Sequence, residues 1–307
     1  MKSKQAELST QQIVLIIILI ASFIVILFFL FRLGIGEESE EQLCRNSVLQ
    51  KASVFSEAPL QCYRDYVCIT KDGSCEGLIK PEKIKVKSLD EVYGTLANEM
   101  ADCWGIFGEG KVDYVGTDFT KNNYCSICSQ IYFDDSLENL EGVKDKKISK
   151  DELYDYLTNN EYSKDQTYSQ YLFGTNNFGA LKQEALQEQG VGTFGKIEIE
   201  KQFFVVMGIT NEVGTIPWVI SAAIGTVAGI AIALTPIGWV ATGVTIVATS
   251  IVGSSVGAAY AEGVEPEIDA IVMEGNGISN NFMRPTIIEA DSNKFEVLNC
   301  EDILTYA

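Results

Sequence analysis

The chain has 307 residues, of which 47% are hydrophobic and 21% charged, so it can hold one or two domains beside any membrane segments. Its 23 Lys and Arg residues against 42 Asp and Glu residues give a net charge of −19, which argues against the basic surface that a nucleic-acid partner needs. The absence of histidine excludes Ser-His-Asp and Cys-His catalysis and removes the commonest zinc and haem ligand.

The first predicted element is an apolar helix close to the N-terminus. Residues 1–12 are polar and carry Lys2 and Lys4, and residues 13–31 contain no charged residue and are long enough to cross a membrane. Because positive residues favour the cytoplasmic side of a membrane, we expect residues 1–12 in the cytoplasm and the chain from Gly34 onward outside it.

The segment Lys4 to Ser9, followed directly by the apolar helix, resembles the N-terminus of archaeal type IV pilin-like precursors. Those precursors are cut between the basic head and the apolar helix. A cut after Ala6 would place Gln11 at the fifth mature position, where that family usually has glutamate. The resemblance implies a pilin-like anchor, and an uncleaved transmembrane helix is the alternative.

Residues 34–195 are predicted to form an acidic, cysteine-rich ectodomain. Leu43 to Ala58 and Leu89 to Phe107 are its best helix candidates, and the second has apolar residues at spacings of three and four. Tyr124 to Asp135 alternates as a β-strand does. Ser149, with a glutamate three residues later, predicts the start of another helix.

Eight cysteines lie outside the apolar runs, and their even number is typical of a disulfide framework in an oxidising compartment. These disulfide candidates are Cys44, Cys62, Cys68, Cys75, Cys103, Cys125, Cys128 and Cys300. Spacing alone does not choose among their pairings. Cys125 and Cys128 have CxxC spacing, so a metal-thiolate site and a redox-active pair are alternatives to structural bridges.

Three short stretches, Ala97 to Trp104, Phe107 to Lys111 and Cys125 to Ser129, together resemble uncharacterised archaeal membrane-anchored cysteine-rich proteins. With the flanking cysteines the resemblance covers residues 44–135. It implies a place at the cell envelope and brings no activity with it.

An acidic group, Glu99, Asp102, Glu109 and Asp113, crowds the second helix candidate and its exit. Carboxylates can run acid–base chemistry or bind calcium, but in so acidic a chain we interpret them as exposed, solvated side chains.

Residues 160–195 are polar and predicted to be a loop with short helices around Tyr168 and Ala185. Gly190 to Gly195 matches a GxGxxG pattern, but the pattern precedes a strand instead of following one, so we interpret it as a flexible linker. Residues 196–212 are predicted to form a strand that leads into the next segment.

Residues 213–261 contain no charged residue. Two apolar runs, Ile216 to Leu234 and Trp239 to Ala261, flank a Thr-Pro-Ile-Gly breaker, which predicts a helical hairpin that re-enters the membrane. Small-xxx-small spacing favours close helix packing. The expected packing glycines are Gly225, Gly229, Gly253 and Gly257. A pore and a hairpin stored until a trigger inserts it are the other interpretations.

Residues 262–307 are predicted to return to the ectodomain as short strands, at 267–273, 286–289 and 295–298. These would pair with the strand before the hairpin in a small antiparallel sheet. The expected fold is therefore α+β, with an N-terminal transmembrane helix, a disulfide-rich extracytoplasmic domain and an inserted glycine-rich transmembrane hairpin.

The sequence favours a non-enzymatic envelope protein that binds or assembles at the cell surface and needs no cofactor. Its expected partners are the lipid bilayer and either further copies of the chain or other envelope proteins, and no nucleic acid. A membrane-tethered thiol-disulfide oxidoreductase using Cys125 and Cys128, and a pore-forming or membrane-remodelling protein acting through the hairpin, are the alternatives.

Overall fold

A computed structural model describes residues 10–32, 40–53, 59–76, 80–115, 123–210, 228–234, 244–250, 267–292, 298, 300 and 302–305. The chain divides into two compact units, residues 1–42 and 43–307. Each unit is described by itself.

The N-terminal unit contains one long helix, α1 (Thr10–Arg32), as the apolar sequence predicts. Its apolar side chains from Val14 to Ile26 are exposed. Among the residues whose side chains the structure describes, which in α1 are 14–26 and Phe28, no helix is long and apolar enough to cross a membrane.

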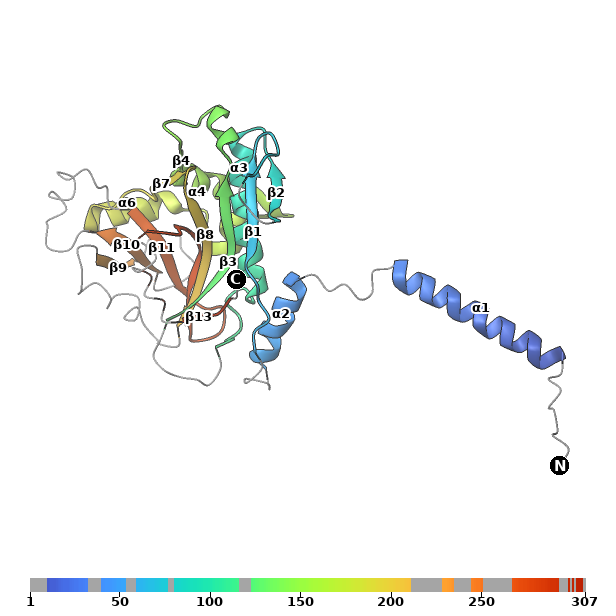
Figure 1. Ribbon diagram of the computed structural model, residues 1–307. Helices are drawn as coiled ribbons and strands as arrows, with labels where there is room; N and C mark the ends of the chain where they lie inside the picture. The colour runs from blue at the N-terminus through green and yellow to red at the C-terminus, as the bar shows by residue number, and fades with distance from the viewer. Residues whose placement is uncertain are drawn as a thin grey trace. The chain divides into compact units, whose positions relative to one another are not determined.

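The second unit is built on a nine-stranded mixed sheet with the order β2-β1-β3-β8-β12-β11-β10-β9, in which β13 also pairs with β3 (Figure 1). The strands are β1 (Asp65–Thr70), β2 (Glu82–Lys85), β3 (Asn123–Phe133), β8 (Gln202–Thr210), β9 (Ala228–Leu234), β10 (Val244–Ser250), β11 (Glu267–Glu274), β12 (Asn281–Glu289) and β13 (Asp302–Ile303). β1 runs parallel to β2 and β3, β13 runs parallel to β3, and the pairs from β3 to β9 are antiparallel. The predicted α+β class and antiparallel pairing are confirmed, and the sheet also has a parallel part.

Two short sheets lie outside the main one, β4 (Lys147–Ser149) with β7 (Lys196–Glu198) and β5 (Glu161–Ser163) with β6 (Gln166–Thr167). The single strand predicted for residues 196–212 is, over its described part, two strands, β7 and β8, separated by a turn.

The helix α2 (Glu40–Lys51) spans the boundary between the two units. The described helices that lie wholly in the second unit are α3 (Leu89–Ile106), α4 (Lys150–Asn159), α5 (Tyr168–Phe173) and α6 (Phe178–Gln189), with a short 3-10 helix at Asp135–Asn139. Local sequence fixes their starts. The hydroxyls of Ser88 and Ser149 accept from the backbone N–H groups of Glu91 and Glu152, which satisfies donors that have no partner inside the helix. The predicted helices around Ser149, Tyr168 and Ala185 are confirmed.

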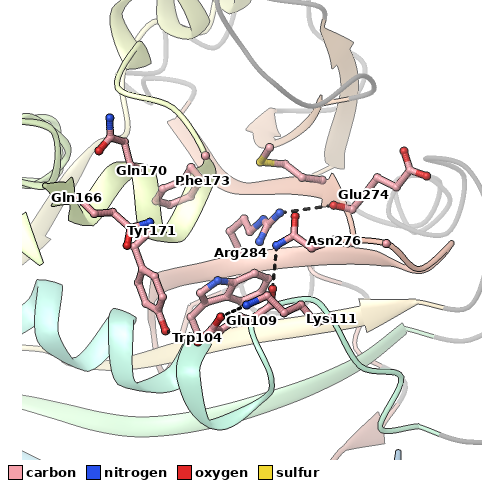
Figure 2. A pocket seen from close by; sticks show the side chains of 14 residues that line it. Trp104, Glu109, Lys111, Gln166, Gln170, Tyr171, Phe173, Glu274, Asn276 and Arg284 are labelled. Carbon is pink, nitrogen blue, oxygen red and sulfur yellow. Dashed lines mark hydrogen bonds and ion pairs between the residues drawn. The ribbon is translucent and has the colours of Figure 1, made fainter. Parts of the chain in front are cut away.

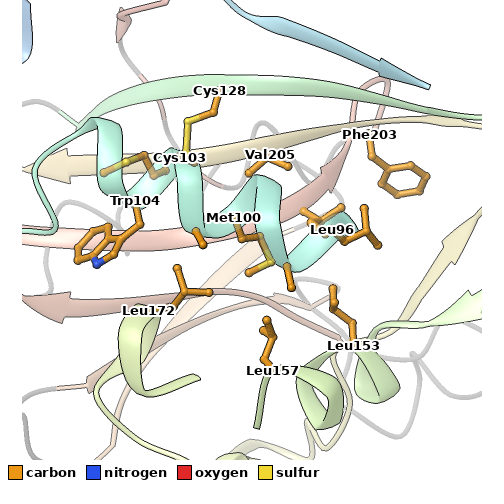
Figure 3. Close-up of a cluster of buried hydrophobic side chains, with 14 of the residues drawn as sticks. Leu96, Met100, Cys103, Trp104, Cys128, Leu153, Leu157, Leu172, Phe203 and Val205 are labelled. Atoms are coloured by element: carbon orange, nitrogen blue, oxygen red, sulfur yellow. A yellow bond between two sulfur atoms is a disulfide. The ribbon is translucent and has the colours of Figure 1, made fainter. Parts of the chain in front are cut away.

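The main core lies where α3 packs on the sheet (Figure 3). The i, i+4 row of Leu96, Met100 and Trp104 is fully buried on α3, which contacts β8, β12, α4 and α5. Each large apolar side chain buried in this way contributes about 1.5–3 kcal/mol. The helix therefore packs between the sheet and the helices α4 and α5.

The helical hairpin predicted for residues 213–261 is wrong where the structure describes that segment. β9 and β10 are antiparallel strands, from Leu234 opposite Val244 to Ala228 opposite Ser250, and β10 pairs in turn with β11. The two runs do lie antiparallel, as expected, but as neighbouring strands that widen the sheet. The β-branched content of both segments, including Ile230 and Ile232, favours strand over helix.

Of the four glycines expected to pack helices together, Gly229 lies in β9 opposite Thr249. Gly225, Gly253 and Gly257 lie outside the described residues, as does most of the predicted strand at 295–298.

Candidate functional site

A pocket of about 500 Å³ lies where the end of α3, helix α5 and the turn between β11 and β12 meet (Figure 2). Its wall includes the aromatic rings of Trp104, Tyr171 and Phe173, the sulfur-containing side chain of Met273, and the polar side chains of Asn276 and Arg284. The volume suits a small organic molecule. Every wall residue belongs to the second compact unit.

Arg284 is the central polar group of this pocket. Its side chain comes from β12 and is only 4% exposed, and its guanidinium carbon lies 4.2 Å from the centre of the Trp104 ring. Nη2 donates to the carbonyl oxygen of Glu274 at the long distance of 3.5 Å, and Nε has no hydrogen-bond acceptor within the described part of the chain. Burial lowers the pKa of Arg284 to about 9.

The turn between β11 and β12 is held against the exit of α3 by two hydrogen bonds. The backbone N–H of Asn276 donates to the carbonyl of Gly110 at 2.7 Å, and its Nδ2 donates to the carbonyl of Glu109 at 3.0 Å. These bonds set the distance between two walls of the pocket.

Gly110 is required at this junction for two reasons. Its φ of +68° favours glycine, and a Cβ there would lie 2.8 Å from Cη2 of Trp104. The Trp104 ring is also held from another side by Phe282, in an edge-to-face contact at 5.9 Å. The Trp104 ring, on which the Arg284 guanidinium stacks, therefore has little freedom to move.

The rim of the pocket carries a second set of polar groups. Lys111 and Glu109 form an ion pair, and the Tyr171 hydroxyl donates to Oε1 of Glu109 at 3.4 Å. The Tyr171 ring stacks on Tyr162 at 4.2 Å. Burial, together with the negative charge of Glu109, raises the pKa of Tyr171, so this phenol stays protonated and can donate a hydrogen bond.

The cysteines form four disulfides, Cys44–Cys62, Cys68–Cys75, Cys103–Cys128 and Cys125–Cys300. The predicted disulfide framework is confirmed. The redox pair and the metal-thiolate site considered for Cys125 and Cys128 are not confirmed. Cys125 is bonded to Cys300 and Cys128 to Cys103. The reason lies in β3, where Cys128 belongs to the core under α3 and Cys125 to the core on the other face of the sheet.

The predicted acidic group does not act as one site. Glu109 lies on the pocket rim, while Asp113 accepts from the N–H of Val115 at 3.0 Å and from Nδ2 of Asn280 at 3.2 Å. Glu99 is half-buried, and burial raises its pKa to about 7. No cluster of acidic or thiol side chains in the described ranges is arranged to hold a metal ion.

The GxGxxG segment is packed, so its interpretation as a flexible linker is wrong. Phe194 stacks on Tyr154 with ring centres 3.6 Å apart, and the carbonyl of Thr193 accepts from the N–H of Ile268 at 2.8 Å. The segment thereby joins α4 to β11.

Arg284 did not emerge from the sequence as a candidate. One signal was present, since it is the only basic residue between Lys201 and Lys294 and stands inside an apolar strand. The other binding groups, such as Trp104 and Asn276, acquire their meaning only when the fold brings them beside it.

Comparison of the chain with protein-family models, with curated proteins and with solved structures finds no match.

Proposed function

We propose that this chain is a non-enzymatic binding protein of the cell envelope, whose disulfide-bonded domain holds a small molecule in the Arg284 pocket. The observation that carries the proposal is the pocket itself. It has the volume of small-molecule sites and combines apolar walls with a few polar groups, as such sites commonly do.

The groups around the pocket suit binding better than catalysis. The chain has no histidine, and all eight cysteines are bonded in disulfides. Glu109 is engaged with Lys111 and Tyr171. What the pocket offers is hydrogen-bond donors, amide groups and aromatic rings, which fix a ligand in place.

The envelope location is supported by two features. Four disulfides persist in an oxidising compartment, and residues 13–31 supply an uncharged stretch long enough for an anchor, which the structure forms as a continuous helix. We propose that this segment holds the chain in the bilayer with the disulfide-bonded domain outside. Its resemblance to pilin-like N-termini makes assembly with further copies part of the same proposal.

Ligand binding is tested with the full chain, purified in mild detergent under oxidising conditions. A library of polar metabolites is screened by thermal shift, and hits are measured by calorimetry. The variant Gln166→Trp adds a large ring at the pocket wall, and Gln187→Trp adds the same ring on the exposed side of α6.

We expect ligands that bind the unmodified chain and Gln187→Trp but bind Gln166→Trp at least about tenfold more weakly, a loss of 1.4 kcal/mol or more. Hits that bind all three proteins equally would place the binding site elsewhere and contradict the proposal.

A further inference from the structure

We propose that the ligand presents a carboxylate to Arg284. This inference rests on the proposed binding function and names the chemical class of the ligand.

The Arg284 side chain has donors that the protein leaves unused. A guanidinium carries five N–H donors, yet Nε has no acceptor among the described residues and Nη2 makes only one long contact, at 3.5 Å. No described carboxylate lies within ion-pair distance of this group. A buried cation without a counter-charge is costly, and the Trp104 ring offsets only part of that cost. An anion in the pocket would supply the missing counter-charge of the guanidinium.

The neighbouring charges select the kind of anion. Lys111 and Glu109 neutralise each other in an ion pair, and a second lining carboxylate, Glu274, belongs to an exposed residue. The buried charge that remains is the single positive charge of Arg284, which is balanced by a monoanion and not by a dianion. A carboxylate carries a single charge, and its two oxygens match the planar fork of a guanidinium.

The other lining residues indicate which chemical groups the ligand carries besides its carboxylate. Phe173 and Met273 offer apolar contact, and Gln166, Gln170 and Asn276 offer amide groups. A small organic acid with an apolar portion and a polar substituent therefore fits the pocket, and its carboxylate end faces Arg284.

The test compares pairs of compounds that differ only in charge, because a carboxamide has the shape of a carboxylate without its negative charge. The probes are benzoate with benzamide, 3-methylbutanoate with 3-methylbutanamide, and inorganic phosphate. Binding to the full chain is measured at pH 7 by ligand-observed NMR and by calorimetry.

Two variants separate the role of Arg284 from the loss of a charged side chain. Arg284→Gln removes the guanidinium from the pocket. Arg64→Gln is a matched control, because Arg64 also stacks on aromatic rings, those of Tyr66 and Phe204, and also has an Nε without an acceptor among the described residues, but it does not line the pocket. If Arg284→Gln fails to fold, as judged by circular dichroism, Arg284→Lys keeps the charge and removes the fork.

We expect the acids to bind about 10- to 100-fold more tightly than their amides, which is the range for a charge-assisted hydrogen bond. Arg284→Gln should abolish this preference, Arg284→Lys should reduce it, and Arg64→Gln should leave it intact. Acids and amides that bind equally would overturn the carboxylate class while leaving the binding function standing. Phosphate binding more tightly than every acid, or no probe binding at millimolar concentration, would also overturn it.

Discussion

Nδ2 of Asn276 donates a hydrogen bond to the backbone carbonyl of Glu109 across 3.0 Å, although 167 positions separate the two residues in the chain. The bond ties the turn between β11 and β12 to the exit of α3. The shape of the pocket therefore depends on a contact between elements that are remote in sequence.

Replacing Asn276 by alanine should lower the free energy of unfolding by about 0.5–1.5 kcal/mol, the usual contribution of one such bond, and should weaken ligand binding as the turn loosens. Asn159→Ala is the control. Its Nδ2 donates to the carbonyl of Asp155 at 2.8 Å within α4, outside the pocket lining. Urea unfolding and calorimetry check both effects. Equal losses of binding in the two variants would argue against a role for the turn.

The two disulfides with the longest and shortest sequence separation should differ in their effect on stability. Cys125–Cys300 closes a loop with a separation of 175 residues, and Cys68–Cys75 one of only 7. In the chain-entropy model, replacing the first pair by serine should cost about 3 kcal/mol more than replacing the second. Chemical denaturation of the two double variants measures this difference. A larger loss for Cys68 and Cys75 would show that native contacts, and not loop closure, dominate.

Asp134 should contribute stability that acid removes. Burial alone would raise the pKa of this carboxyl, but hydrogen bonds from Ser136 and Ser74 outweigh it and lower the pKa to about 2. The carboxylate also accepts from the backbone N–H of Cys75 at 3.0 Å. Because the folded-state pKa lies below the unfolded one, this stability is present above about pH 4 and is lost as the pH falls to about 2.

Asp134→Asn should therefore lower the free energy of unfolding at pH 7 by about 1–3 kcal/mol and flatten its decline between about pH 4 and 2. The neighbouring exposed residue provides the control, Asp135→Asn. Unfolding curves collected from pH 2 to 7 give the comparison. If the free energy of unfolding of Asp134→Asn fell between about pH 4 and 2 as steeply as that of the unmodified chain, Asp134 would not be the group that causes the decline.

Glu99 should change the pH dependence of stability in the direction opposite to that of Asp134. Burial, reinforced by the nearby charges of Asp102, Asp65 and Glu82, raises its pKa to about 7. A raised carboxyl pKa means that the folded chain binds the proton more tightly, so this side chain makes stability fall as the pH rises from about 4.3 to 7.

Glu99→Gln should be more stable than the unmodified chain at pH 8. It should also lack the loss of stability that ionisation of Glu99 causes between about pH 4.3 and 7. The exposed residue Glu141, changed to glutamine, serves as the control. Thermal unfolding measured from pH 4 to 8 checks the prediction. If both variants follow the unmodified pH profile, Glu99 does not titrate in this range.

Cysteine accessibility on whole cells tests the proposed location. A membrane-impermeant thiol reagent should label the chain only after external reduction, because an extracytoplasmic domain would present its eight cysteines as disulfides. Labelling confined to lysed cells that were never reduced would place free thiols inside and reverse the topology.

Elements with strong local signals could be predicted from the sequence. α3 shows apolar spacing of three and four, β3 alternates, and Ser149 caps α4, because each of these patterns reflects a neighbour within a few residues. The even cysteine count indicated disulfides. Their pairing could not be predicted, because Cys128 and Cys125 take partners on opposite faces of one strand.

The segment around β9 and β10 could not be assigned correctly because its strongest feature, the absence of charge, is compatible with a membrane helix and with a buried strand. The sheet edge offered by β11 decides the outcome, and that edge is a tertiary feature. The same holds for Arg284, whose burial is created by Trp104 on α3. From the sequence alone, a charged residue in an apolar strand indicates only a break in the apolar pattern. Its role as a buried binding group becomes visible once the contact with Trp104 is known.

The Cys125–Cys300 bond keeps the chain in one covalent piece after a cut in its backbone. A single cut of the backbone anywhere between Cys128 and Cys300 leaves an N-terminal fragment that contains Cys125 and a C-terminal fragment that contains Cys300, still joined as one covalent molecule. A cut between Cys128 and Met273 would put Trp104 and Arg284 on different fragments without releasing either. A nicked chain would thus run as a single band without reduction and as two bands after it.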